Sequence, residues 1–328
     1  MVTDSKVEFP RRAAWSAQLT RRLGHGDLFF RALTVFASML VLLVTLAIGY
    51  ELWGNSALPR DKFGLQFLTG VDWNPVTEVF GALPFIYGTL LTSFLAVLIS
   101  VPIGLGIAIF LAELAPTWLR QPLGFLVELL AAVPSVIYGL WGLYVFVPIL
   151  VQPTAKLLNA NLSFLPLFEG PVFGPSRLAA ALILSIMILP TISSVSRDVL
   201  LAIPRAQREA SLALGATEWE TISQVLMPYG LSGILGAVIL GLGRALGETI
   251  AVTMVIGNNL DLSASLLHPG YTMASIIANE FSEATSDLYR QVLIEIGLVL
   301  FIITLLLNLI ARLLVWRVAR RVSTEARV

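Results

Sequence analysis

The sequence contains no cysteine, only two histidines and only three lysines among 328 residues. Without cysteine the chain can form no disulfide, no thiolate metal site and no cysteine nucleophile. His25 and His268 lie too far apart to form a histidine metal cluster. None of the lysines follows a glycine, so no phosphate-binding loop of the form GxxxxGK[ST] is present. Any energy from ATP therefore has to reach this chain through a partner.

Charge is also scarce, because 13% of the residues are charged and 57% are hydrophobic. Soluble domains carry roughly 25% charged residues, so the composition indicates a polytopic membrane protein. Crossing a hydrocarbon core of roughly 30 Å takes about 20 apolar residues. Six segments qualify, and we expect an all-α fold with six transmembrane helices. These segments cover residues 32–52, 84–111, 123–150, 178–196, 229–258 and 291–316.

The distribution of arginine and lysine predicts the orientation. An even number of spans places both termini on one side of the membrane. With the termini inside, the cytoplasmic parts hold 15 of these residues and the outer loops hold 5. This bias follows the positive-inside rule. We therefore expect both termini to be cytoplasmic.

The spans divide the chain into a series of expected parts. The three outer loops cover 53–83, 151–177 and 259–290, and they are rich in proline, glycine, asparagine and aromatic residues. They are either connectors or a platform for an external partner, and their length favours a platform. The parts are a cytoplasmic tail (1–31), the first transmembrane helix (32–52), a periplasmic loop (53–83), a core of five transmembrane helices (84–316) that contains a cytoplasmic loop (198–228), and a cytoplasmic C-terminal tail (317–328).

The cytoplasmic loop 198–228 has the pattern of a helical hairpin. Pro204 fits the first turn of a helix, and Gly215 can adopt the left-handed conformation that ends one. The segment Thr217-Glu218-Trp219-Glu220 forms a capping box for a second helix. We expect Pro228 to end that helix before the fifth span. The pattern is compatible with an amphipathic hairpin on the membrane surface or with a rigid element that transmits force from a soluble motor.

Arg244 and Glu248 are exceptions in spans that are otherwise mostly free of charge, and Thr249 follows them. At a spacing of four residues the two charges share one helix face and can pair. An arginine near the bilayer centre costs roughly 2.5–3.5 kcal/mol, so such residues usually face the protein interior or a wet cavity. A guanidinium group offers five donors in a fork that suits a tetrahedral oxyanion. The pair is therefore either part of an anion path or a structural clasp between helices.

Proline and glycine predict further features of the spans. Pro102, Pro134 and Pro190 interrupt apolar runs and are candidate helix kinks, because proline removes a backbone donor. Gly243 and Gly247 form a GxxxG pair, which allows two membrane helices to approach closely. We expect the fifth span to face a second membrane subunit.

The hairpin sequence resembles the EAA loop of ABC-importer permeases, in which Glu-Ala-Ala is followed by a glycine and then by Ile-x-Leu-Pro. The matching residues here are Glu209, Ala210, Ser211, Gly215 and Pro228, with Val225 for isoleucine and Met227 for leucine. Further segments at 84–93, 133–142, 188–191 and 241–249 resemble the PstC permeases of phosphate-specific importers. The resemblance covers about residues 80–325.

This resemblance implies the MetI-like fold of a type I ABC importer permease, and a transport subunit rather than an enzyme. Its function would be to move inorganic phosphate across the bacterial inner membrane by alternating access. The implied partners are a second, PstA-like permease, two PstB-like ATPase subunits and a periplasmic, PstS-like phosphate-binding protein, with no nucleic acid. No cofactor is expected on this chain, since ATP and Mg would bind the partner ATPase.

The resemblance also implies roles for individual residues. In the family the first helix of the EAA loop sits in a cleft of the ATPase, so Glu209 would face that subunit and Gly215 would permit the tight turn. Charged residues of the fifth span are thought to take part in phosphate passage, which corresponds here to Arg244 and Glu248.

The residues by themselves leave other classes open. An ion-coupled secondary transporter would need no ATPase, but it typically shows intramembrane acids and repeated halves. A membrane-embedded enzyme would need a nucleophile and a base, which are hard to build from one histidine in each of two distant loops. An arginine fork also does not distinguish phosphate from sulfate, molybdate or phosphonate, and phosphate rests on the resemblance alone.

Overall fold

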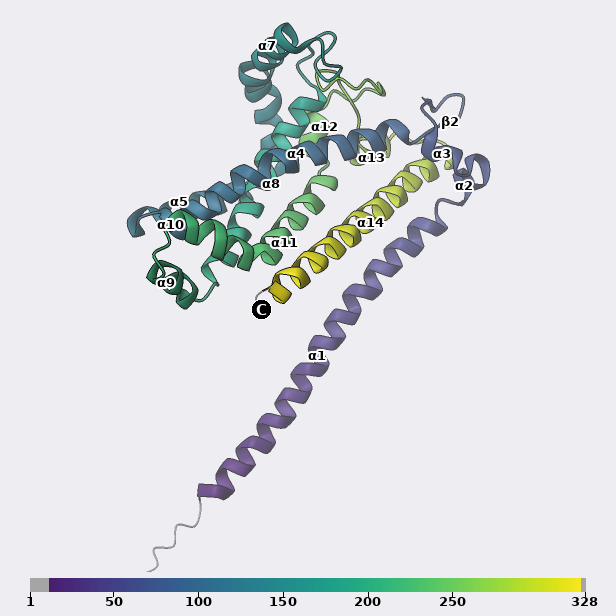
Figure 1. Ribbon diagram of the computed structural model, residues 1–328. Helices are drawn as coiled ribbons and strands as arrows, with labels where there is room; N and C mark the ends of the chain where they lie inside the picture. Colours follow the sequence, from purple (N-terminus) through teal and green to yellow (C-terminus); the bar gives the residue numbers. More distant parts are fainter. Residues whose placement is uncertain (1–11, 326–328) are drawn as a thin grey trace, which may run out of the picture. The chain divides into compact units, whose positions relative to one another are not determined.

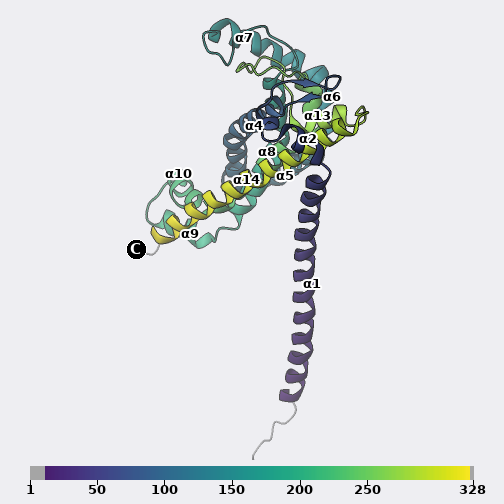
Figure 2. The same cartoon turned by 90° about the vertical axis from the view of Figure 1, so that its right-hand side faces the viewer.

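The computed structural model describes residues 12–325, with side chains from 28 to 317, and it is almost entirely α-helical (Figures 1 and 2). Within the described residues six helical segments are long and apolar enough to cross a membrane, which confirms the predicted number. The chain divides after Gly54 into two compact units. The six segments are Leu28–Gly54, Leu83–Leu114, Ser135–Leu162, Arg177–Leu201, Glu218–Leu246 and Asp287–Arg317.

The first unit is one helix, α1 (Arg12–Gly54), which contains the first apolar span. The predicted tail over 1–31 is therefore helical from Arg12 and continues into the span without a break. Residues 1–11 of this tail lie outside the described residues, as do residues 326–328 of the predicted C-terminal tail.

The second unit contains all remaining elements. Its two strands form an antiparallel ribbon in which Trp73 pairs with Phe80. Three π-helical segments, η1 to η3, each join or extend α-helices. The elements in order are α2 (Ala57–Phe63), α3 (Gln66–Thr69), β1 (Trp73–Asn74), β2 (Val79–Phe80), α4 (Leu83–Ile109), η1 (Phe110–Leu114), α5 (Thr117–Ala132), α6 (Ser135–Trp141), η2 (Gly142–Val151), α7 (Gln152–Leu162), α8 (Arg177–Leu201), α9 (Arg205–Ala213), α10 (Glu218–Glu220), η3 (Thr221–Leu226), α11 (Met227–Leu246), α12 (Ile250–Val255), α13 (Met273–Glu280) and α14 (Asp287–Glu325).

Helix α8 lies at the centre of the second unit, between α4 and α11 (Figure 1). Small residues allow this close packing: a Cβ on Gly104 of α4 would come within 3.1 Å of Ile192 on α8. The same is true of α11, where a Cβ on Gly241 would come within 2.8 Å of Ile192. Close approach of this kind is what small residues provide in membrane helices. Gly243 of the predicted GxxxG pair packs against nothing in the described part of the chain, so its face is open.

The predicted third span, 123–150, is wrong in its position. Helix α5 ends at Ala132 and α6 begins at Ser135, and the crossing helix then continues to Leu162. Pro134 causes the break, because it is extended (φ −58°, ψ 141°) and forces Val133 out of the helical region as well. The predicted outer loop 151–177 therefore begins as helix α7.

The predicted fifth span, 229–258, is also wrong in its bounds. The helical run begins at Glu218 and ends at Leu246, and α12 starts only at Ile250. The break at residues 247–249 places the charged pair of the sequence at a helix end rather than inside a helix.

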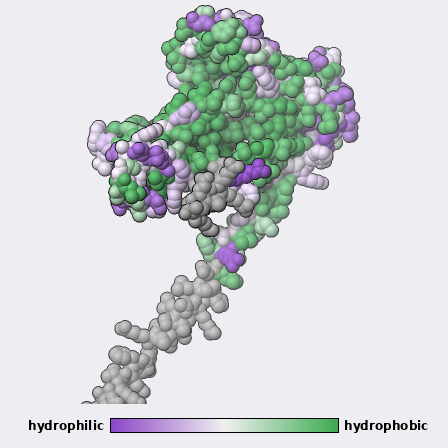
Figure 3. Space-filling view, viewed as in Figure 1, coloured by the Kyte–Doolittle hydropathy of each residue, from purple (hydrophilic) through white to green (hydrophobic). Residues whose placement is uncertain are grey.

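One end of the second unit, which we call the loop end, contains α2, α3, β1, β2 and α13. It has its own aromatic core, in which the Trp73 and Phe80 rings lie 4.9 Å apart. The Trp73 indole N–H also donates to Glu280 over 2.8 Å. Hydrophilic residues gather at this end and at the opposite end, which contains α9 and α10, and the body between them is hydrophobic (Figure 3). The outer loops at the loop end therefore form folded structure rather than flexible connections.

Arg177, the first residue of α8, is fully buried and organises the loop over 257–272 at the loop end. Its guanidinium donates to the backbone carbonyls of Asp261, Ser263 (2.5 Å) and Ser265 (3.0 Å). Burial raises the pKa of the Asp261 carboxyl, but hydrogen bonds with His268 and the Ser263 N–H, together with the Arg177 charge, lower the pKa below its usual value overall.

Replacing Arg177 with methionine is expected to loosen this loop, because one buried and two part-buried carbonyls then lose a hydrogen-bond donor. The expected loss is about 3 kcal/mol of stability, with faster amide hydrogen exchange over 257–272. Arg290→Met is the control, since the Arg290 side chain is half-exposed and, among the described residues, its ion pair with Asp287 is long at 3.8 Å. Equal protection of residues 257–272 from amide hydrogen exchange in Arg177→Met and Arg290→Met would contradict the role of Arg177 in holding this loop.

Candidate functional site

The predicted hairpin is present and is formed by α9, a short turn and the α10–η3 helix. Gly215 makes the turn with φ +88°, which confirms the predicted left-handed residue. The predicted capping box is also confirmed: the Thr217 N–H donates to Glu220 Oε2 over 2.8 Å, and the Glu220 N–H donates to Thr217 Oγ1 over 3.2 Å. The turn is therefore rigid for local chemical reasons.

The hairpin presents an exposed surface that the rest of the described chain does not cover. Glu209 and Ala210 are exposed on α9, where no residue is buried. At the tip, Leu214 is 90% exposed and Trp219 is 68% exposed. Ser211 faces inward instead, and its Oγ lies 2.9 Å from Thr221 Oγ1, which joins the two arms. Large apolar groups exposed at a tip are typical of a surface that meets another protein.

Pro228 does not end the second helix of the hairpin, so this prediction was wrong. Residues 218–246 are helical throughout, and Pro228 lies in the first turn of α11. The missing N–H is tolerated there because the preceding turn, η3, has widened to π-helical geometry. The hairpin is thus continuous with the fifth span.

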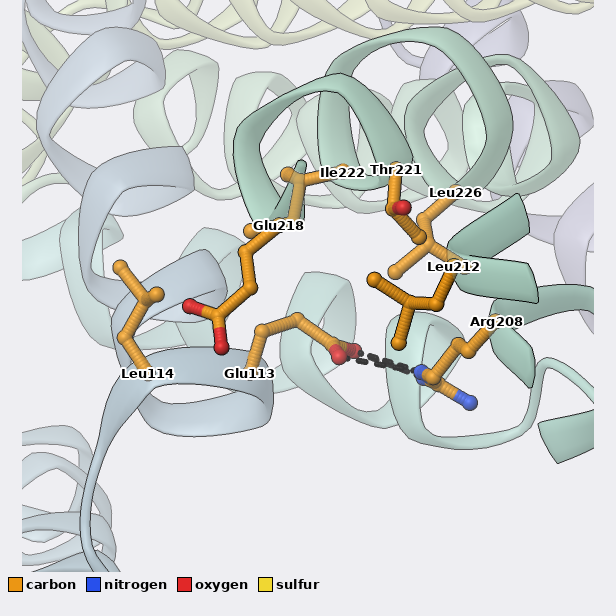
Figure 4. Close-up of a pocket in the computed structure, with 8 residues that line it drawn as sticks. All are labelled: Glu113, Leu114, Arg208, Leu212, Glu218, Thr221, Ile222 and Leu226. Atoms are coloured by element: carbon orange, nitrogen blue, oxygen red, sulfur yellow. Dashed lines mark hydrogen bonds and ion pairs between the residues drawn. The ribbon is translucent and has the colours of Figure 1, made fainter. Parts of the chain in front are cut away.

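A cavity of about 130 Å³ lies beneath the hairpin, and an ion pair closes one side of it (Figure 4). Arg208 Nη2 lies 2.7 Å from Glu113 Oε1, and Arg208 Nε lies 3.0 Å from Glu113 Oε2. The same guanidinium donates to the carbonyls of Ile203 (2.8 Å) and Leu200 (2.7 Å). The cavity is lined by Glu113, Leu114, Arg208, Leu212, Glu218, Thr221, Ile222 and Leu226.

The sequence analysis missed this pair, which joins residues that are distant in the chain. One signal was available, since Glu113 is the single acidic residue between positions 84 and 127. A second pair was missed for the same reason: Arg197 of α8 lies 3.1 Å from Glu128 of α5 and 3.0 Å from Asp198.

Arg244 and Glu248 do not pair with each other, contrary to the expected i, i+4 contact. Arg244 is in the last turn of α11, and the helix ends before Glu248 is reached. Glu248 Oε1 instead accepts from the Ala251 N–H (3.3 Å) in α12, while Thr249 is the N-cap residue of that helix. The break separates the two charges into different local settings.

Arg244 is half-buried and turns toward α8, where its Nη1 donates to Thr191 Oγ1 over 3.3 Å. Thr191 directly follows Pro190, which is buried inside α8. A guanidinium has five N–H donors. In the described part of the chain the Arg244 side chain makes one hydrogen bond, the one to Thr191. Most of its donors therefore have no hydrogen-bond partner in the described part of the chain.

The three predicted kinks have different outcomes. Pro134 breaks its helix outright, as described above. Pro102 lies within α4 and Pro190 within α8, and both helices continue through them. A bend at these two prolines stays a prediction.

Six spanning helices, a rigid hairpin at one end and a half-buried arginine at the break of the fifth span define a membrane transport subunit. Residues 104–324, more than half of the chain, match the family model described as "Binding-protein-dependent transport system inner membrane component". The chain belongs to this family.

Curated relatives support this membership across nearly the whole chain. A protein of Mesorhizobium japonicum named "Phosphate transport system permease protein PstC" is 48% identical over 92% of this chain and 93% of its own length. A protein of the same name from Pasteurella multocida is 48% identical over 92% of this chain and 96% of its own length. A protein of Methanocaldococcus jannaschii named as a probable PstC is 39% identical over 86% of this chain.

Solved structures show the same fold. A bacterial alginate ABC transporter chain is similar with a TM-score of 0.58 and 16% identity, and covers 90% of this chain and 96% of its own. A chain of the MetNI methionine ABC transporter has a TM-score of 0.55 and 19% identity over 75% of this chain. These matches confirm the predicted MetI-like permease fold.

Proposed function

We propose that this chain is a permease subunit of an ATP-driven phosphate importer, and that it moves inorganic phosphate across the bacterial inner membrane by alternating access. The observation that carries the proposal is the 48% identity with PstC permeases over 92% of the chain. The exposed, rigid hairpin supports the same function, because a subunit without an ATP-binding loop needs a contact through which a motor can act on it.

The proposed assembly contains a second, PstA-like permease, two PstB-like ATPase subunits that bind ATP and Mg, and a PstS-like phosphate-binding protein. The hairpin end would lie in the cytoplasm together with both termini, and the loop end would lie in the periplasm. The folded loop end supports this arrangement, because an ordered surface is suited to receive a binding protein.

The hairpin is the proposed contact with the ATPase. Glu209 and Ala210 supply its exposed face, Ser211 joins the two arms, Gly215 makes the turn and Pro228 lies where the hairpin passes into the fifth span. When the ATPase dimer closes, it would push on this face, and the continuous helix 218–246 would carry the movement into the membrane.

Arg244 is the proposed anion contact on the translocation path, and Glu248 and Thr249 border it at the helix break. The free donors of the guanidinium suit an oxyanion. Glu248 is separated from Arg244 by the break, so it would limit the local positive charge without occupying the donors. This arrangement favours binding that is weak enough for release.

The test is phosphate uptake into proteoliposomes that contain the complete importer. Uptake of labelled phosphate should require both ATP inside and loaded binding protein outside, and excess sulfate or molybdate should not reduce it. Uptake that persists without ATP but requires a proton gradient would contradict the proposed ATP-driven mechanism. Competition by sulfate would contradict the assignment of phosphate as the specific substrate.

A further inference from the structure

We infer that Arg208 and Glu113, which we call the hairpin clasp, form the tie through which movement of α9 is transmitted to α4 and α8. Arg208 is then a positioning residue for the transport cycle, since it touches neither the anion nor ATP. The inference rests on the proposed function of the hairpin as the contact with the ATPase.

The clasp connects three elements that are distant in sequence. Arg208 belongs to α9, Glu113 to the π-helical turn η1 at the end of α4, and the two carbonyl acceptors to the end of α8 and the residues after it. The last carbonyls of a helix have no partner within that helix. The Leu200 carbonyl of α8 accepts from the Ile203 N–H (3.3 Å) and also from Arg208, and the carbonyl of Ile203, just after α8, accepts from Arg208 as well. A single guanidinium therefore holds the ends of two spans against the hairpin.

Helix α9 depends on this tie because it has little hydrophobic anchorage. No residue of α9 is buried, whereas Ile222 and Leu226 of the other arm are 4% and 1% exposed and belong to a core cluster. The second arm is therefore held by apolar packing and the first by polar contacts. In the described part of the chain those contacts are the clasp and the Ser211–Thr221 hydrogen bond.

The surroundings of the clasp make it stronger than an ordinary surface ion pair. The Arg208 and Glu113 side chains are 19% and 13% exposed, and Leu212, Ile222 and Leu226 line the cavity beside them. Exposed pairs are screened and contribute little, but a bidentate, charge-assisted pair with restricted solvent access is stiff as well as strong. A stiff link transmits displacement, which a flexible link would absorb.

The π-helical turn explains why Glu113 can reach the hairpin. The Ala115 N–H donates to the Phe110 carbonyl over 2.7 Å, five residues earlier, so the end of α4 is wider than an α-helix. Single π-turns of this kind are frequent at functional sites. Glu113 is the acidic residue of this turn, and its carboxylate points toward Arg208 of α9 (Figure 4).

The test compares Glu113→Ala, Glu113→Gln, Arg208→Gln and the double variant E113Q/R208Q in the complete importer in proteoliposomes. The readout is the number of phosphate ions imported per ATP hydrolysed, which a purely structural role would not alter once assembled complex is normalised. We expect this ratio to fall about tenfold in E113A and R208Q, since the charge-assisted pair is lost. The double variant should be no worse than R208Q alone, because both changes break the same link.

Glu128→Gln is the matched control. It weakens another ion pair to α8, that of Arg197, without touching the hairpin, and its ratio should equal that of the wild type. An unchanged ratio in E113A and R208Q, or an equal fall in E128Q, would overturn the inference. Wild-type importer that hydrolyses ATP but moves no phosphate would overturn the proposed function instead, so the two failures are distinguishable.

Discussion

Replacing Gly215 with valine is expected to uncouple ATP hydrolysis from uptake, while capture of the loaded binding protein stays intact. Gly215 has φ +88°, a conformation that costs roughly 1–2 kcal/mol for a residue with a Cβ. A β-branched side chain would force the turn to open and would displace α9 from its capped partner helix. We expect phosphate uptake to fall about tenfold or more at a normal level of assembled complex, since misplacing a rigid element by about 1 Å is already costly.

The control for this variant is Gly215→Asn. Asparagine tolerates the left-handed conformation better than other residues with side chains, and nothing lies within 4 Å of a Cβ at this position. Uptake in Gly215→Asn should therefore stay close to that of the wild type. Coupled transport at the normal rate in Gly215→Val would refute the proposed role of the turn.

Replacing Arg244 with glutamine is expected to abolish most phosphate transport in a complex that still assembles. The change removes a charge and most of the donors that would hold an oxyanion, and charged hydrogen bonds are roughly twice as strong as neutral ones. Labelled phosphate uptake and the amount of complex recovered from the membrane are the two measurements. We expect uptake to fall by about 100-fold, and Arg244→Lys to keep part of the activity because it keeps the charge.

Thr191→Val separates an anion contact from a structural clasp. This substitution removes the hydroxyl that accepts a hydrogen bond from Arg244 and leaves the arginine charge in place. If Arg244 were only a clasp to α8, Thr191→Val would lower stability as much as Arg244→Gln and both would transport alike. The account is contradicted if Arg244→Gln assembles and imports phosphate at the wild-type rate.

Local features of this protein follow from the sequence because their causes lie within a few residues. The left-handed turn at Gly215 and the Thr217–Glu220 capping box depend on neighbouring chemistry alone, and both predictions were confirmed. The number of spans also follows from apolar length. Proline was harder to interpret, because Pro134 breaks a helix and Pro228 does not. The difference arises from the π-helical turn before Pro228, which composition does not reveal.

Contacts between distant residues could not be predicted in this way. The expected Arg244–Glu248 pair assumed an unbroken helix. Helix α11 instead ends between the two residues, with Gly247 as its C-cap. Glu113 and Arg208 meet because η1 and α8 end where α9 begins, which depends on helix packing. The hydrophobic periodicity of a single segment does not indicate which residues of distant segments come into contact. The burial of Arg177 was missed for the same reason, since its acceptors lie on a loop more than eighty residues later.

The most direct test of the account is the side of the membrane on which the hairpin lies. The chain has no cysteine, so Leu214→Cys places one thiol of this subunit at the hairpin tip, where the residue is 90% exposed. Val76→Cys places one at the loop end, where the residue is 92% exposed. A membrane-impermeant maleimide should label the Val76→Cys variant in intact spheroplasts. It should label the Leu214→Cys variant only in inverted vesicles, and added ATPase subunit should protect that thiol. Labelling of the hairpin thiol from the outside, or no protection by the ATPase, would contradict the account.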